Sequence, residues 1–440
     1  MKFTANLPEN LLEHIVSLYL PIQSALANRS VSKRFNEGEI RSRDLDFSGI
    51  YSVRRKQAEV VRAVEDVFNQ HNGPDIDRFV LILNHLGVKD KIISWVKTCV
   101  EKNIQELVLD FSKSRKTIEL PIDFSAVETL TVLTLRWCTF KIPDNSPKGL
   151  KLLKRLTLMK TEVKQEMIDA ILNNCIYLTT LALEQCYMRG KFSINAHDHK
   201  KFKTLAVRSM PKLLEIIMDA PTLEIFFYEG YAKLFDFSRV VALKEVDLHY
   251  HGRHCWRYYD ASDMVRANMG ALLGVRVLAT TNIFLEALTL KCNPMSGEMT
   301  APTFCFPNLK EFEIAFEAPT VCNFFDIAEF IKHCPKLEKV LIDVRNFTFD
   351  PGFMWEFHYE QDIQKYDKRF LRSIKEVKII GYKGDKHELT LVAFFIWKAQ
   401  SLKKLELVIS TIARLLARGF DYGNINAVKS IYPSVVVTEY

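Results

Sequence analysis

The sequence has 440 residues, of which 48% are hydrophobic and 26% are charged, which is the balance of a folded protein and excludes a disordered chain. Its net charge of +7 comes from 60 Lys and Arg against 53 Asp and Glu scattered along the chain, so no block of like charges predicts a nucleic-acid-binding arm. The N-terminus lacks the pattern of a secretory signal and the apolar run from Leu389 to Trp397 is too short to cross a bilayer, so we expect a cytoplasmic or nuclear protein whose nine cysteines are reduced.

The stretch from Leu7 to Phe35 predicts a small helical unit. Pro8 suits the first turn of a helix, and the apolar residues after it cover an arc of roughly 160°, wider than the roughly 100° stripe of an ordinary surface helix. Pro21 ends this helix, and a second helix follows. Since a unit of about 40 residues rarely stabilises itself, its apolar side must pack on the rest of the chain or on another protein.

A strand lies between two helices in the next part of the chain. Residues 54–68 predict a helix, residues 78–83 a strand, and residues 89–102 a second helix. This alternation predicts the first, imperfect turns of a repeat.

The repeat itself is clear from residue 104 onward. The segments LTVLTLRWC (130–138), LTTLALEQC (178–186) and LEALTLKCN (285–293) fit the leucine-rich-repeat signature L-x-x-L-x-L-x-x-N/C. Alternate strand residues such as Leu133 and Leu135 are expected to point into a core, and the final Cys or Asn to cap backbone groups of the neighbouring turn. The sequence therefore predicts an α/β leucine-rich-repeat solenoid, a horseshoe with parallel strands. Looser copies begin at residues 104, 153, 202, 243, 309, 337, 374 and 402.

The spacing of the repeats is irregular at two places. A proline stands two residues before Leu213 and Leu223, as it does before other repeats, and the short interval between these leucines predicts a shortened turn. The interval from 342 to 374 predicts a long loop. Its aromatic part, Asn346 to Glu360, could bind a partner, but a lid on the solenoid core is the preferred interpretation.

The outward residues of the strands change sign along the chain. Early turns present Arg136, Arg155 and Arg208, and later turns present acidic residues. If these residues line one concave face, its later part is acidic and would recruit a basic segment of a substrate; the alternative is an ordinary solvated surface. The acidic residues are Glu215, Asp219, Glu229, Glu245, Asp247, Glu311, Glu313 and Asp343, of which Glu245, Asp247, Glu311, Glu313 and Asp343 are the candidate substrate-binding residues.

No pattern predicts catalysis, a cofactor or a metal. The segment HYHGRHC (249–255) contains three imidazoles and a thiol that could bind zinc, but no second ligand pair stands nearby at finger-like spacing. A solvated junction between a strand and a loop is therefore the preferred interpretation. No phosphate-binding loop, dinucleotide fingerprint or nucleophile motif occurs in the sequence, and we expect a protein that is not an enzyme.

The opening stretch resembles an F-box, which begins with Leu-Pro, has Leu-Pro between its helices, and ends with Ser-Lys-Arg and an aromatic residue. The resemblance implies docking onto a Skp-type adaptor and, through it, a cullin ubiquitin ligase. The alternative is a helical cap on the first repeat. The residues implied in docking are Leu7, Pro8, Leu11, Leu12, Ile15, Leu20, Pro21, Ile22, Val31, Lys33, Arg34 and Phe35.

The segment from Leu371 to Ile409 resembles the FBD segment that closes many plant F-box/leucine-rich-repeat proteins, for which an end cap of the solenoid is the preferred interpretation. The two resemblances imply an all-α F-box domain (1–43), a solenoid (44–372) and an FBD-like end (373–440). They imply the substrate receptor of a ubiquitin ligase. The alternatives are an interaction scaffold with a degenerate F-box and a receptor that senses a small molecule. The matching FBD positions are Gly381, Tyr382, Gly384, Glu388, Leu389, Leu402, Lys403 and Lys404.

Overall fold

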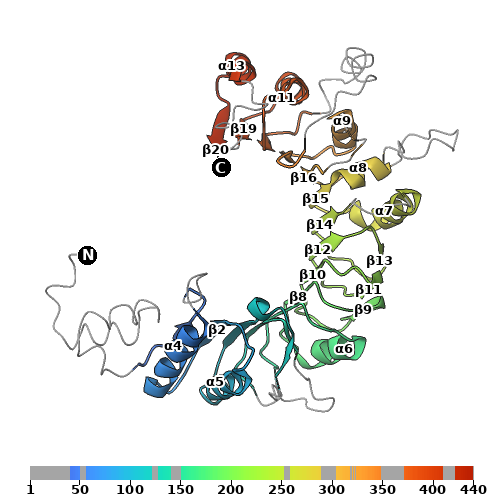
Figure 1. The fold of residues 1–440 in the computed structure, drawn as a ribbon. Helices are drawn as coiled ribbons and strands as arrows, with labels where there is room; N and C mark the ends of the chain where they lie inside the picture. Colours follow the sequence, from blue (N-terminus) through green and yellow to red (C-terminus); the bar gives the residue numbers. More distant parts are fainter. Residues whose placement is uncertain are drawn as a thin grey trace, which may run out of the picture. The chain divides into compact units, whose positions relative to one another are not determined.

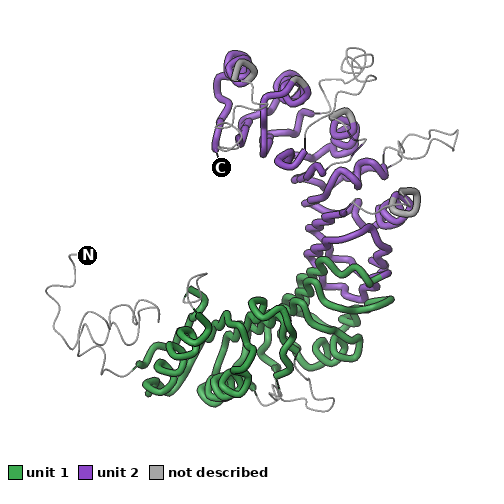
Figure 2. Tube along the Cα trace, viewed as in Figure 1, with its two compact units in different colours: residues 1–213 green, residues 214–440 purple. Residues whose placement is uncertain are grey.

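The computed structural model describes residues 40–49, 56–120, 127–139, 150–251, 258–288, 304–317, 320, 322, 324–347, 371–409 and 422–439. The chain divides into two compact units, Met1–Leu213 and Leu214–Tyr440, which are coloured separately in Figure 2. Each unit contains a ladder of parallel strands with helices along one side (Figure 1). Among the described helices, none has the length and apolar character that a membrane crossing requires.

The ladder of unit 1 contains the strands that the repeat pattern predicts. The helices and strand expected at 54–68, 78–83 and 89–102 are confirmed as α4, β2 and α5. The strands follow one another in the order β1 (Asp44–Asp46), β2 (Arg78–Ile82), β3 (Glu106–Asp110), β5 (Val132–Arg136), β7 (Arg155–Met159), β8 (Thr180–Glu184) and β10 (Thr204–Arg208). The other elements are α4 (Gln57–Gln70), α5 (Lys89–Glu101), α6 (Gln165–Asn174), the 3₁₀ helix η1 (Ser112–Ser114), and the short strands β4 (Ile118–Glu119), β6 (Cys138–Thr139) and β9 (Gly190–Asn195).

Stacked leucines form the core of unit 1. Leu133 of β5 lies in register between Leu107 of β3 and Leu156 of β7, and all three side chains are fully buried. Because each turn exposes such a row on both sides, it must be covered by the next turn. Cys186, the last residue of its signature, is buried and its thiol donates to the backbone oxygen of Leu158 in the preceding turn, at 3.2 Å. The expected capping role of this cysteine is thereby confirmed.

The ladder of unit 2 continues to the end of the described chain and includes the FBD-like segment. Its strands follow in the order β12 (Ile225–Gly230), β14 (Glu245–Tyr250), β15 (Val277–Thr281), β16 (Glu311–Ala315), β17 (Lys339–Asp343), β18 (Glu376–Ile380), β19 (Lys404–Ile409) and β20 (Val436–Glu439). The helices are α7 (Tyr258–Leu272), α8 (Asn282–Leu288), α9 (Phe324–Lys332), α11 (Lys386–Lys398) and α13 (Tyr422–Ile431).

The strand predicted within LEALTLKCN is wrong. Leu285 and Leu288 belong to helix α8, and the strand of this turn is β15, which ends just before the helix. Leucines three residues apart suit one side of a helix as well as the repeat signature, so the pattern does not separate the two structures. A helical contact fixes the outcome, because Asn282 Nδ2 donates to the buried Glu286 carboxylate four residues later at 3.0 Å.

The shortened turn predicted between Leu213 and Leu223 is also wrong. The segment after Leu213 forms β11 (Leu213–Asp219), which pairs with β13 (Leu234–Asp236) in a second parallel sheet. The acidic residues Glu215 and Asp219 therefore lie outside the ladder and do not share a face with the other acidic residues.

The FBD-like motif forms a tight turn between β18 and α11. Gly381 has φ +84°, and a Cβ atom there would lie 2.5 Å from the backbone of Arg345 in the preceding turn. Glu388 Oε2 accepts hydrogen bonds from the backbone N–H groups of Lys383 (2.7 Å) and Gly384 (2.8 Å). Burial, and next the nearby Asp385, raises the pKa of this carboxyl to about 7. The motif thus fixes the start of α11 against the ladder.

Replacing Gly381 by alanine tests this packing. Positive φ and the close approach to Arg345 should together lower the free energy of unfolding by at least about 2 kcal/mol. The matched control is Gly270→Ala in α7, where an added Cβ meets nothing within 4 Å and should stabilise by about 0.5–1 kcal/mol. Urea denaturation of the two variants measures both effects, and similar midpoints for the two variants would contradict the turn described above.

Candidate functional site

The residues predicted to dock an adaptor, from Leu7 to Phe35, lie outside the described residues, as does most of the loop from Asn346 to Glu360. The described part of that loop ends at Phe347. This side chain is buried, and its ring stacks on Phe316 with the ring centroids 5.4 Å apart.

Every second residue of the unit 2 ladder points away from the helices, and we call this surface the helix-free face. It carries all five residues predicted to bind a substrate. Parallel pairing arranges its residues in three rows across the strands. The first row is Glu245, Val277, Glu311, Lys339, Glu376 and Lys404; the second is Asp247, Ala279, Glu313, Leu341, Lys378 and Glu406; the third includes Glu229, His249, Ala315 and Asp343.

The charges of this face are mixed toward its C-terminal end. Lys339 Nζ lies 3.2 Å from Glu311 Oε1 on the neighbouring strand, and Lys378 Nζ lies 3.0 Å from Glu406 Oε1. These residues line a hollow of about 180 Å³. Exposed ion pairs of this kind stabilise the fold by at most about 1 kcal/mol each. Their lysines and glutamates can therefore separate and pair with the charges of another molecule. The acidic part of the face therefore does not extend to its C-terminal end, where lysines and glutamates alternate.

The acidic character is concentrated around Glu313, whose side chain is exposed. Partial loss of solvent around its carboxyl, followed by the nearby carboxylates of Asp247 and Asp343, raises the pKa of Glu313 above its usual value, while Arg345 opposes the shift. Arg345 Nη2 lies 2.6 Å from Asp343 Oδ2. Like charges held together on a folded surface cost free energy, and a cationic group that binds between them recovers that cost.

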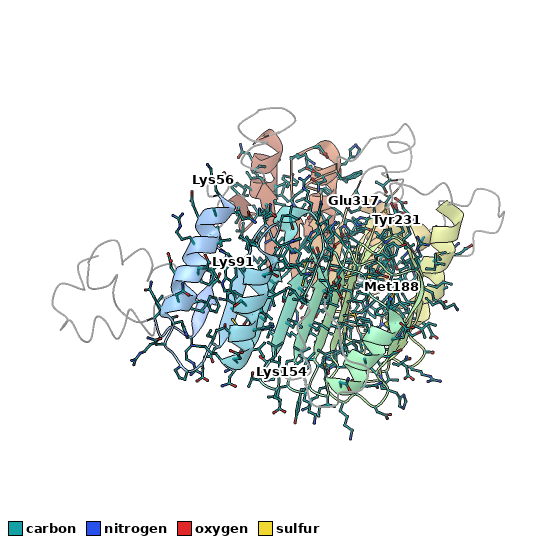
Figure 3. The ribbon with its side chains drawn as sticks, turned by 60° about the horizontal axis from the view of Figure 1, so that its bottom comes forward. Lys56, Lys91, Lys154, Met188, Tyr231 and Glu317 are labelled. Atoms are coloured by element: carbon teal, nitrogen blue, oxygen red, sulfur yellow. The ribbon has the colours of Figure 1, made fainter. Side chains whose placement is uncertain are left out.

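Two histidines extend this acidic part toward the ends of the strands. His249 and His251 are two residues apart and point to the same side of the chain, with ring centroids 5.2 Å apart. His249 Nε2 lies 3.2 Å from Glu317 Oε1, and His251 Nε2 lies 3.3 Å from Glu229 Oε1 (Glu317 is labelled in Figure 3). The hydrogen bond with Glu317 raises the pKa of His249.

Sequence reasoning missed the role of Glu317 in this cluster. The residue is 68 positions from His249 and belongs to no local motif with it. Glu229, in contrast, is the register partner of His249 on the neighbouring strand. Its position within its own repeat could therefore have predicted that the two residues lie close together.

The corresponding surface of unit 1 has a different chemistry. Its middle row begins with Asp46 on β1 and continues with the uncharged residues Val80, Val108, Thr134, Thr157, Ala182 and Ala206. Arg78 bridges Asp46 (2.9 Å) and Glu106 (3.3 Å), and Arg136 pairs with Asp110 at 3.2 Å. Of the three arginines predicted to face outward in the early turns, Arg136 therefore takes part in a local ion pair.

Neutralising Glu313 tests the unfavourable charge arrangement. Because the pKa of Glu313 is raised on folding, its charge opposes folding above the unfolded value of 4.5, and Glu313→Gln should raise the unfolding free energy at pH 7 by roughly 0.5 kcal/mol. The gain should shrink as the pH falls through the raised pKa toward 4.5.

Glu311→Gln, two residues away on the same strand, is the matched control. It removes the pair with Lys339 and should leave stability unchanged or lower it by up to about 0.5 kcal/mol. Urea denaturation at several pH values separates the two variants. A loss of stability for Glu313→Gln at pH 7 would show that its neighbours favour the charge.

Comparison with known proteins agrees with this repeat architecture. The family model described as the leucine-rich-repeat domain of At1g61320/AtMIF1 matches residues 67–418. The FBD-associated F-box protein At1g61320 of Arabidopsis thaliana is 54% identical, over 100% of this chain and 96% of its own length. The putative FBD-associated F-box protein At1g61330 of the same plant is 53% identical over 100% and 98%, and the putative F-box protein At3g29830 is 21% identical over 93% and 92%. The chain belongs to the family of FBD-associated F-box proteins with leucine-rich repeats.

Proposed function

We propose that the protein is the substrate-recognition subunit of an SCF-type (Skp–cullin–F-box) ubiquitin ligase. The observation that carries this proposal is the match to relatives named F-box proteins over the whole chain, which includes the segment Leu7–Phe35. In this segment the chain has the Leu-Pro start, the internal Leu-Pro and the Ser-Lys-Arg-aromatic end.

The apolar side chains of this segment supply the adaptor contact. Leu11, Leu12 and Ile15 lie on one side of a predicted helix, and a Skp-type adaptor that covers them removes their surface from water, at roughly 25 cal/mol per Å². Lys33 and Arg34 remain at the edge of such an interface, where charged residues affect association more than affinity.

The repeats hold the target while other subunits carry out the chemistry. A receptor of this kind is not catalytic, because ubiquitin transfer then depends on the proximity of a target lysine to a conjugating enzyme. It would act in the cytoplasm or nucleus together with the cullin complex.

The helix-free face of unit 2 is the surface that we assign to the target. The group around Glu313 attracts cationic groups, and the paired lysines and glutamates beside it can re-pair with the charges of a bound segment. A basic segment of an extended chain fits this chemistry. The assigned residues are Glu245, Asp247, Glu311, Glu313 and Asp343.

Two variants test the proposal, and each serves as the control for the other. Pro8→Ala/Leu12→Ala should abolish co-purification with a Skp-type adaptor and leave target capture by the repeats unchanged. Charge reversal at Glu245, Asp247, Glu311 and Glu313 should do the opposite, because the two variants change different segments of the chain. Co-purification measures the first effect, and quantitative proximity labelling measures the second.

Two results would contradict the assignment. Adaptor binding that persists in Pro8→Ala/Leu12→Ala, or that is absent from the unaltered protein, would leave an interaction scaffold with a degenerate F-box. Unchanged labelling after charge reversal would remove the target from the helix-free face while leaving the adaptor contact standing.

A further inference from the structure

We propose that His249, His251 and Glu317, together with Glu229, form a Zn²⁺ site at the edge of the helix-free face. The proposal rests on the side-chain geometry of unit 2 alone and is independent of the ubiquitin-ligase assignment.

The donor atoms already converge. One ligand atom each from His249, His251 and Glu317 lies within 4.8 Å of the other two. Donors that bind Zn²⁺ tetrahedrally at about 2.0–2.2 Å lie about 3.3 to 3.6 Å from one another. Since these side chains are only half-buried, at 36–37% exposure, rotations of the side chains close the remaining distance without movement of the strands.

The ligands come from three segments of the fold. His249 belongs to β14 and His251 follows it, so the two imidazoles share one side of the chain. Glu229 on β12 is the register partner of His249. Glu317, after β16, is anchored through its backbone N–H, which donates to Oδ1 of the buried Asn282 at 2.9 Å. Such anchoring of ligand-bearing segments favours a fixed site over a chance group of side chains.

The electrostatics also suit a divalent cation. Two imidazoles and two carboxylates would neutralise Zn²⁺, and Asp247 adds further negative charge near His249. Without a metal, these groups form two ion pairs, His249–Glu317 at 3.2 Å and His251–Glu229 at 3.3 Å. Both distances exceed those of well-formed charge-assisted hydrogen bonds, which are about 2.7–2.9 Å. A metal bound by His249, His251 and Glu317 satisfies these three groups better than the pairs do, and Glu229, whose carboxylate lies 3.3 Å from His251, would supply the fourth ligand.

The ligand types select the metal. Imidazole nitrogens with carboxylate oxygens suit Zn²⁺, whereas Ca²⁺ and Mg²⁺ prefer oxygen ligands throughout. Within the described part of the chain, this is the one group of three or more histidine, cysteine or acidic residues with converging donors. A bound ion would connect β14 with the segment after β16, which are separated in the ladder by β15. It should therefore stabilise unit 2 in proportion to its occupancy.

Zinc titration of the full-length protein tests the site. After treatment with a chelator, the protein is titrated with ZnCl₂ by calorimetry, and its unfolding temperature is followed with and without the metal. His249→Gln/His251→Gln should lose one equivalent of bound Zn²⁺ and the associated rise in unfolding temperature. Glu317→Gln should weaken that equivalent by at least about tenfold.

The matched control is His333→Gln. His333 Nε2 also lies 3.3 Å from a carboxylate, that of Glu329, but no third ligand among the described residues converges there, so this variant should bind Zn²⁺ as the unaltered protein does. Circular dichroism without metal verifies that each variant is folded, and if the double histidine variant does not fold, Glu317→Gln decides alone. The proposal fails if the unaltered protein binds no Zn²⁺ at micromolar concentrations, or if the variants at 249, 251 and 317 bind as many equivalents, with the same affinity, as His333→Gln.

Discussion

Backbone hydrogen bonds between parallel strands, made in a fixed register, are the interaction on which the rest of this structure depends. Because side chains alternate along a strand, the register places the leucines of one turn against those of the next and sends the residues between them to the opposite side. Leu107, Leu133 and Leu156 form one such buried row. A slip of one residue in any strand would expose its leucines and bury its charges.

The same register brings together the side chains of the surface that we assign to the target. On the helix-free face, Glu245 and Glu311 lie in one row although 66 positions separate them in the sequence, and Val277 stands between them. Since neighbouring strands are about 4.8 Å apart, charges on adjacent turns interact directly, as Glu311 and Lys339 do. Specificity is therefore a property of rows that cross the repeats, and each repeat contributes one or two side chains to it.

The sequence was most informative where local pattern and global fold agree. The strands that begin after residues 104, 130, 153 and 178 were predictable because their leucines have a spacing that suits a buried ladder row. The helix at Leu285 and the second sheet at Leu213 were not predictable, since leucine spacing and a preceding proline are compatible with more than one structure. The contact of His249 with Glu317 depends on pairing between strands, which no local motif records. The F-box assignment, in contrast, rests on sequence motifs and relatives alone.

Disulfide trapping across β16 and β17 measures the register most directly. Glu313 and Leu341 are register partners about 4.8 Å apart, within the 4.4–6.8 Å between Cα atoms that a disulfide spans. Glu311 and Leu341 are offset by two residues, about 8 Å, which is too far. The pair Glu313→Cys/Leu341→Cys should form an intramolecular disulfide on mild oxidation and Glu311→Cys/Leu341→Cys should not, as identified by mass spectrometry of the digested protein. Efficient bridging of the offset pair, with none in the register pair, would contradict the ladder and the face built on it.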